Sequence, residues 1–245
     1  MDKKSGDHED KGFFGSFFSL LFPPLCPLCK GFVEKTGFCG ACISGFKKIE
    51  GPICGICGIP FASENSPNHT CGECIKNKAP FVKARSAYQY EGKILDAIHL
   101  FKYSANLGLA LPLSELTARA IDFGEKEKPD IITPVPLHRK RLKKRGFNQS
   151  LILARHLAKI LGVSEVDCLH LERIRHTPPQ TNLRERERRI NVKGAFSVKD
   201  PSPFKNKRVL LVDDVLTTGA TVRECSKVLK KAGAEVFIVT LARVF

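Results

Sequence analysis

The sequence predicts an α/β protein in which a parallel sheet flanked by helices follows a small domain rich in cysteine. Eight of the ten cysteines lie before residue 75, in four pairs of the form C-x2-C. From about Arg85 onwards, segments with apolar residues at helical spacing alternate with short apolar segments typical of strands. Strands that alternate with helices along a chain form a parallel sheet with helices on both faces.

The elements expected after Arg85 follow from the spacing of apolar residues and from the residues that end each segment. The expected helices cover residues 92–103, 107–121, 148–161 and 219–232. The expected strands cover residues 130–135, 168–171, 208–212 and 235–244. The strand at 208–212 is apolar without interruption, and such a strand belongs in the middle of a parallel sheet.

The first 22 residues divide into a charged tail and an apolar run. We expect residues 1–11 to be disordered. Residues 13–22 are apolar but too few to span a bilayer, which needs about 20 residues, and the acidic residues before them do not suit a signal peptide. We therefore expect a helix packed on the cysteine-rich domain (residues 12–84) and no stable membrane insertion. Association with a membrane surface stays open as the alternative.

The cysteine pairs predict two structural zinc ions. A C-x2-C pair places two thiolates on a tight turn, and two pairs complete a tetrahedral site of four sulfurs. Because four thiolates leave no open coordination position, the metal would stabilise the fold and would not act in catalysis. Iron–sulfur ligation is the main alternative. The expected ligands are Cys26, Cys29, Cys39, Cys42, Cys54, Cys57, Cys71 and Cys74.

The four pairs can combine sequentially or in a cross-braced pattern. Sequential combination closes shorter loops and is therefore preferred. His69 could be a further ligand, but an ordinary loop histidine is favoured. Cys168 and Cys225 lie among apolar residues and are expected to be buried free thiols. Metal-type spacing, rather than a disulfide framework, indicates a cytoplasmic protein.

The densest chemical pattern is VLLVDDVLTTGAT at residues 209–221. A buried strand ends here in Asp213 and Asp214, and a loop of small residues then leads into a helix. Free backbone N–H groups in such a loop, together with the helix dipole, bind phosphate well. The two carboxylates can accept hydrogen bonds from a sugar diol at the edge where open α/β sheets bind ligands. An ordinary turn with an acidic helix cap is the alternative.

These residues resemble the 5-phosphoribosyl diphosphate (PRPP) signature of type I phosphoribosyltransferases, and the wider chain resembles the ComF family (ComFC and its relatives). The resemblance covers nearly everything after residue 12. It implies a double zinc ribbon over residues 12–84 and a type I phosphoribosyltransferase domain over residues 85–245. Further parts of the pattern are Phe101-Lys102-Tyr103, PVPLHRKRLKKRGFNQS at residues 134–150, and Thr177, Gln180, Leu183, Arg188 and Asn191.

The resemblance also implies roles for individual residues. Asp213 and Asp214 would be catalytic and would face the ribose 2′ and 3′ hydroxyls, with Mg²⁺ accompanying PRPP. The 5′-phosphate would bind Thr217, Thr218, Gly219, Ala220 and Thr221.

Three other segments complete the expected site. The pyrophosphate would face the segment after residue 135, which contains Pro136 and Arg139. A flexible hood over residues 175–191 would close the site. Its candidate residues are Arg175, Thr177, Gln180 and Arg188. The basic side chain of Lys102 is a further candidate for phosphate contact.

One departure bears on the acceptor of the phosphoribosyl group. An aspartate in this loop handles the base in 6-oxopurine phosphoribosyltransferases, and Thr217 stands at the matching position here. The departure weakens a purine-salvage function, and no other base-recognition motif is visible. The acceptor therefore stays open.

The net charge of +15 indicates a polyanionic partner and leaves two functions open. The first is an enzyme that transfers phosphoribose from PRPP to an unknown acceptor. The second is a non-catalytic protein that senses PRPP or handles single-stranded DNA. The resemblance to the ComF family implies a role in natural transformation, in which the protein would act beside a ComFA-like helicase. The basic stretch at residues 139–145 suits contact with a phosphate backbone, and pyrophosphate release compared with DNA binding would separate the two functions.

Overall fold

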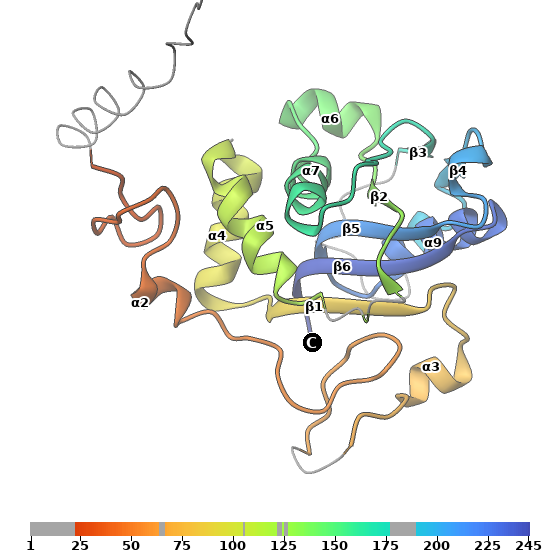
Figure 1. Ribbon diagram of the computed structural model, residues 1–245, viewed down its shortest axis with the longest axis horizontal. Helices are drawn as coiled ribbons and strands as arrows, with labels where there is room; N and C mark the ends of the chain where they lie inside the picture. Colours follow the sequence, from red (N-terminus) through yellow and green to blue (C-terminus); the bar gives the residue numbers. More distant parts are fainter. Residues whose placement is uncertain (1–22, 64–66, 105, 122–123, 125–126, 177–189) are drawn as a thin grey trace, which may run out of the picture.

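The computed structural model describes residues 23–63, 67–104, 106–121, 124, 127–176 and 190–245. A four-stranded parallel sheet forms its centre, with helices on both faces (Figure 1). Across the sheet the strands lie in the order β1 (Lys83–Gln89), β6 (Glu235–Arg243), β5 (Arg208–Leu216) and β2 (Ile131–Pro134). The expected fold class, a parallel sheet flanked by helices after a small cysteine-rich domain, is confirmed.

Successive residues of β5 point to opposite faces of the sheet, as the pleat requires. Leu210 and Val212 pack in the core beneath α4 (Gly92–Tyr103), α5 (Ala110–Ala118) and α7 (Gln149–Leu161). Val209 and Leu211 pack in the second core, on the side of α9 (Ala220–Lys231). A small antiparallel hairpin of β3 (Leu171–Arg173) and β4 (Phe196–Val198) completes this second side. The sheet is therefore covered on both faces.

The helices expected at 92–103, 148–161 and 219–232 are confirmed within one residue at each end. The helix expected at 107–121 is shorter: a 3-10 turn, η1 (Leu107–Leu109), leads into α5, which ends at Ala118. A short helix, α6 (Arg139–Arg145), lies in the basic stretch. The remaining short elements are α2 (Gly40–Ile43), α3 (Gly72–Lys76) and η4 (Ser202–Phe204).

The strand expected at 168–171 is wrong. Asp167 turns the chain there, because its carboxylate accepts a hydrogen bond from the backbone N–H of His170. Only Val166 pairs with the main sheet, in a parallel bridge to Ile132, and β3 pairs with β4 instead. The edge strand β1 was not expected from the sequence, because its polar residues interrupt the apolar pattern.

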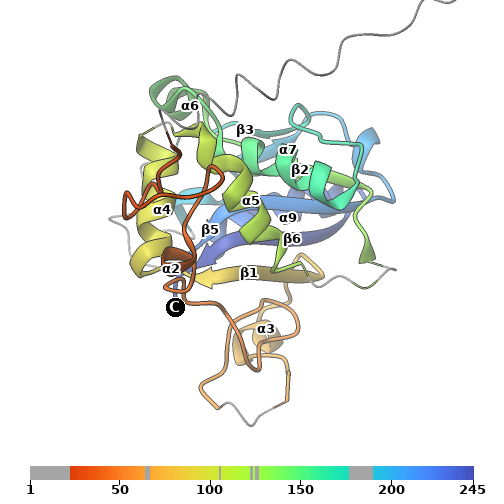
Figure 2. The ribbon, with the colours of Figure 1, turned by 60° about the vertical axis from the view of Figure 1, so that its left-hand side comes forward.

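The expected border between residues 84 and 85 falls inside β1. The first cysteine module (residues 23–48) lies beside α4, and the second module (residues 52–78) lies below β1; both views agree on this (Figures 1 and 2). Within the described part of the chain, every helix is too short or too polar to cross a bilayer. The expected tail at 1–11 and the apolar run at 13–22 lie outside the described residues.

Candidate functional site

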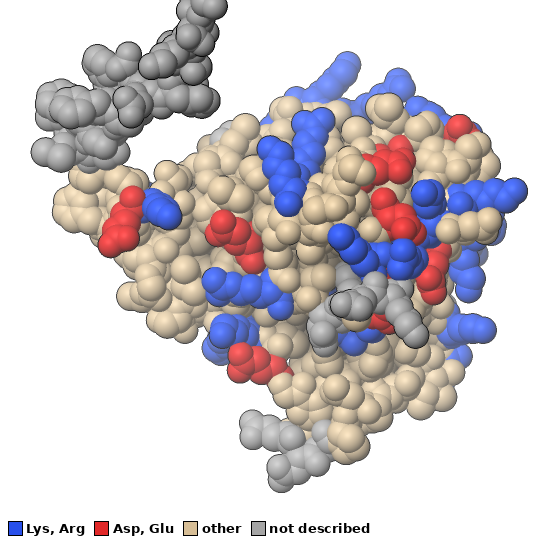
Figure 3. All heavy atoms as spheres, viewed as in Figure 1, with Lys and Arg blue, Asp and Glu red and all other residues tan. Residues whose placement is uncertain are grey.

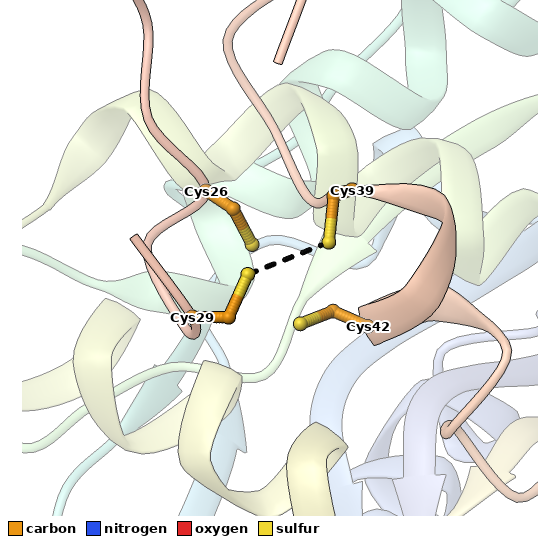
Figure 4. A group of neighbouring side chains, drawn as sticks. All are labelled: Cys26, Cys29, Cys39 and Cys42. Carbon is orange, nitrogen blue, oxygen red and sulfur yellow. Dashed lines mark hydrogen bonds between the residues drawn. The ribbon is translucent and has the colours of Figure 1, made fainter. Parts of the chain in front are cut away.

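The first cysteine tetrad consists of Cys26, Cys29, Cys39 and Cys42. The four sulfurs lie within 4.8 Å of one another and point toward a common centre (Figure 4). The Sγ atoms of Cys29 and Cys39 are 3.5 Å apart. Cys42 lies in the short helix α2, and the other three lie in the turns around it.

The second tetrad consists of Cys54, Cys57, Cys71 and Cys74, and its sulfurs also lie within 4.8 Å of one another. Backbone N–H groups of Cys57 and Cys71 donate to the Sγ of Cys54 at 3.5 and 3.3 Å. Burial alone would raise the pKa of the Cys54 thiol, but these N–H groups outweigh it and lower the pKa to about 6. The turn is thus built to stabilise a thiolate.

Both tetrads fit structural zinc. Each offers four sulfurs at tetrahedral spacing with no other ligand type among the described residues. The sequential combination of pairs is confirmed. His69 does not belong to the second group of ligand atoms, and its ring stacks on Phe61 with centroids 3.6 Å apart. Of the two remaining cysteines, Cys225 is buried as expected. Cys168 is exposed, since it follows the turn at Asp167 and does not lie in a strand.

The two modules are attached to the sheet domain in different ways. Phe46 of the first module lies between Phe38 and Tyr88, with ring centroids 5.5 and 5.7 Å away, so this module shares the core under α4. The second module approaches the sheet edge with its backbone. The N–H of Ala84 donates to the Ile56 carbonyl at 2.7 Å, and a Cβ on Gly58 would lie only 2.5 Å from the Ala84 carbonyl oxygen.

Asp213 and Asp214 lie near the carboxyl end of β5, and because they are neighbours in a strand their side chains diverge. Asp213 Oδ1 accepts a hydrogen bond from Ser150 Oγ at 2.9 Å. Ser150 lies in the first turn of α7, whose N-terminus therefore faces this carboxylate. Burial, and then the charge of Asp214, raise the pKa of Asp213 to about 7. A carboxyl group poised in this way can exchange a proton near neutral pH.

Asp214 forms an ion pair with Lys102, whose Nζ lies 2.5 Å from Asp214 Oδ2. Both groups are almost enclosed, with 14% and 6% of their side chains exposed. Burial alone would lower the pKa of Lys102, but the carboxylate of Asp214 outweighs burial and raises it. Lys102, a candidate for phosphate contact in the sequence, thus lies at the site and neutralises one of the two carboxylates.

The loop between β5 and α9 is shorter than expected, because β5 continues to Leu216. Only Thr217, Thr218 and Gly219 separate the strand from the helix, and Ala220 and Thr221 form its first turn. Gly219 adopts a left-handed conformation with φ of 72°, which favours glycine. A Cβ built there would meet only Leu216, at 3.9 Å. The side of Gly219 on which a Cβ would lie is thus open, whereas the Ala220 N–H at the start of α9 donates to Thr218 Oγ1 at 3.4 Å.

The segment after β2 lies next to this loop, because β2 and β5 are parallel neighbours with Pro134 opposite Val212. Asn148 fixes it: its Nδ2 donates to the Val135 carbonyl at 3.1 Å. Pro136 is half-buried in this segment, and Arg139 is exposed as the first residue of α6. The structure thus brings the expected pyrophosphate segment to the same sheet edge as Asp213.

The hood candidates are only partly described. Thr177, Gln180 and Arg188 lie outside the described residues. Arg175 closes the base of this segment, since its guanidinium donates to the carbonyls of Asn191 and Lys193 at 3.0 and 2.6 Å.

The sequence analysis did not identify two residues of the site, Ser150 and Arg173. Ser150 was quoted only as the end of a motif, although its position just inside an Asn-capped helix could have suggested a site role. Arg173 is buried in β3 with its guanidinium over the Phe196 ring. Burial, then the charge of Arg141, lower its pKa to about 10, while Asp213 acts in the opposite sense. No pattern in the sequence distinguished this arginine from its neighbours.

Known proteins resemble this chain along most of its length. A model of the double zinc ribbon domain matches residues 17–75, and a model of the phosphoribosyl transferase domain matches residues 148–244. Competence protein F of Haemophilus influenzae is 33% identical over 217 residues, which cover 86% of this chain and 92% of that protein.

Two further relatives cover similar shares. The DNA utilization protein YhgH of Escherichia coli is 32% identical over 221 residues, covering 88% of this chain and 94% of that protein. Competence protein ComFC of Bacillus subtilis is 27% identical over 217 residues, covering 84% and 83%. With its double zinc ribbon and its phosphoribosyltransferase-type domain, the chain belongs to the ComF family.

Proposed function

We propose that this protein binds PRPP with Mg²⁺ at the edge of the sheet and acts in the handling of incoming DNA. The observation that carries the proposal is the pair of carboxylates at the end of β5, followed at once by a three-residue loop and the N-terminus of α9. Asp213 Oδ2 accepts no hydrogen bond from the described residues, so it is available to a ribose hydroxyl.

The remaining groups fit the other parts of PRPP. The N–H groups of residues 217–221 suit the 5′-phosphate, because the N-terminus of a helix carries a positive potential. The segment after β2 and the buried cation of Arg173 suit the pyrophosphate. Mg²⁺ would enter with the pyrophosphate oxygens, and the nearby carboxylates are the ligand type that it prefers. In the transfer, an acceptor would attack the anomeric carbon and take the phosphoribosyl group, while the bond from that carbon to pyrophosphate breaks and pyrophosphate leaves.

A role in DNA uptake is supported by the relatives, which are named for competence and DNA utilization. It is also supported by α6, in which six of the seven residues are basic. Lys and Arg side chains line the upper edge of the molecule, where α6 lies (Figure 3). The second candidate function is non-catalytic. The protein would keep the phosphoribosyl site, sense PRPP or handle single-stranded DNA, and act beside a helicase partner. Pyrophosphate release from PRPP with mixed nucleobases and amines distinguishes the two candidates.

Calorimetric titration of PRPP–Mg²⁺ into three proteins tests the site. Asp213→Asn keeps the shape and leaves the Lys102–Asp214 pair intact. It should weaken binding by roughly 1.5–3 kcal/mol, the value of a charged hydrogen bond. Thr218→Val should weaken binding while the melting temperature stays at the wild-type value. If the aspartates serve only as a helix cap, Asp213→Asn will lower the melting temperature and leave PRPP binding unchanged.

A further inference from the structure

A cavity of about 480 Å³ lies between the second cysteine module and the sheet domain. Three separate parts of the chain form its walls: α3 with the residues after it, the segment from Ile190 to Lys193, and the first two turns of α9. We call this cavity the interdomain groove. No residue expected to bind PRPP lines it except Ala220.

The interdomain groove is strongly cationic. Its cations are Lys76, Lys78, Lys193, Arg223 and Lys227. Its two acids are Glu73 and Glu224. Among the described residues, no carboxylate forms an ion pair with Lys76, Lys78 or Lys193. A concave surface with cations of one sign and low-dielectric walls concentrates a positive potential.

The acid Glu224 is engaged within the wall of the groove. Glu224 accepts a hydrogen bond from the backbone N–H of Gly194 at 3.0 Å and pairs with Lys227 Nζ at 2.5 Å. Its negative charge therefore holds one wall of the groove together and does little to neutralise the three unpaired lysines.

The position of the groove connects it to the proposed PRPP site. Ala220 lines it, and Ala220 directly follows Gly219 of the phosphate-type loop. Arg223 lies one turn further along α9, with its guanidinium 5.6 Å from the centre of the Phe81 ring. A flat guanidinium held on an aromatic ring is a surface on which a base or a phosphate can rest.

We propose that the interdomain groove binds the sugar–phosphate backbone of single-stranded DNA and leads it toward the N-terminus of α9. The proposal rests on the DNA-handling part of the proposed function and names the surface that performs it. A cavity of about 480 Å³ holds part of a strand, and the guanidinium of Arg223 can stack on a base that only a single strand exposes. The helix α6, in contrast, has no buried residue and lines no part of this groove.

Two matched triple variants test the groove. In the first, Lys76, Lys78 and Lys193 are replaced by Gln. In the second, the control, the exposed residues Lys205, Lys207 and Lys231 are replaced by Gln, at the opposite end of β5 and α9. Both variants lose the same charge. Binding of a fluorescent oligo(dT) strand and of the matching duplex is measured over a range of salt concentrations, and PRPP–Mg²⁺ binding is measured by calorimetry.

The groove variant should bind oligo(dT) about tenfold more weakly, with a salt slope about 2 units shallower, since each lost phosphate contact contributes about 0.7. The control should bind oligo(dT) as wild type does, and PRPP binding should be unchanged in both variants. Equal losses in the groove variant and the control would overturn the proposal, as would wild-type binding that favours the duplex. Loss of PRPP binding in wild type would instead count against the PRPP site, and leave the groove to be judged by the DNA data.

Discussion

The cysteine tetrads and the carboxylate pair are both clusters of groups that repel one another when ionised, yet the chain compensates them differently. Each tetrad comes from a single short stretch, residues 26–42 or 54–74, and depends on a cation from outside. The carboxylates of Asp213 and Asp214 instead meet Lys102 and Ser150, which lie far away in sequence. The tetrads should therefore fold only with metal, whereas contacts within the chain itself compensate the carboxylates.

Removal of zinc should have the largest effect on the stability of the protein. We expect two zinc ions per chain by elemental analysis, with metal binding contributing on the order of 10–16 kcal/mol to folding of each module. Cys42→Ser and Cys74→Ser form a matched pair, because each removes one ligand. Cys42 shares the core under α4, so its replacement should lower the melting temperature of the whole chain, while Cys74→Ser should unfold mainly the second module. One zinc ion or none in a fully folded wild-type protein would contradict this account.

Breaking the ion pair between Lys102 and Asp214 should have the next largest effect on stability. Asp214→Leu leaves Lys102 charged and buried without a partner, and should lower the free energy of unfolding by about 3–5 kcal/mol in chemical denaturation. Adding Lys102→Met to that variant should restore most of the loss, because both charges are then gone. If the double variant is no more stable than Asp214→Leu, the loss of stability in Asp214→Leu does not come from the unpaired charge of Lys102.

The close approach of the second module to β1 should have an intermediate effect. Gly58 has φ of 69°, and an added Cβ would lie 2.5 Å from the Ala84 carbonyl oxygen. Gly58→Ala should therefore cost about 2 kcal/mol of unfolding free energy. Gly55→Ala is the control, since a Cβ there meets nothing within 4 Å. Equal stability of the two variants would show that the module is not held in this position.

The pH dependence of stability should be the smallest effect. Burial, and then Asp214, raise the pKa of Asp213 from 3.8 to about 7 in the folded protein. The folded state therefore holds the extra proton, and this contribution to stability is lost as pH rises through 7. Between pH 6 and pH 8 the wild type should lose about 1.4 kcal/mol relative to Asp213→Asn. Denaturant titrations of both proteins at the two pH values measure the difference, and parallel curves would refute it.

The contrast between the cysteine tetrads, each from one short stretch, and the carboxylate site, built from distant residues, also explains how much of the molecule could be predicted from the sequence. The C-x2-C spacing predicted the eight cysteine ligands, because it places two thiolates on one tight turn. The sequential combination was preferred for its shorter loops, while the cross-braced pattern stayed open. Apolar periodicity predicted α4, α7 and the central strand β5. The prediction of a strand at 168–171 was wrong, because a hydrogen bond from the backbone N–H of His170 to the Asp167 carboxylate makes a turn there.

Contacts between distant residues could not be predicted in this way. The pairing of Lys102 with Asp214 joins residues on α4 and β5, and the burial of Arg173 depends on how the β3–β4 hairpin packs. Neither leaves a periodic signal along the chain. The interdomain groove is the extreme case, because it exists only where α3 packs near α9.

The central claim is that PRPP lies across the end of β5, and a crystal structure of the wild-type protein soaked with PRPP and Mg²⁺ tests it most directly. We expect the ribose diol at the carboxylates of Asp213 and Asp214, and the 5′-phosphate on the N–H groups of residues 217–221. Crystals of folded, zinc-loaded protein that show no PRPP at millimolar concentration, or show it away from this loop, would contradict the claim.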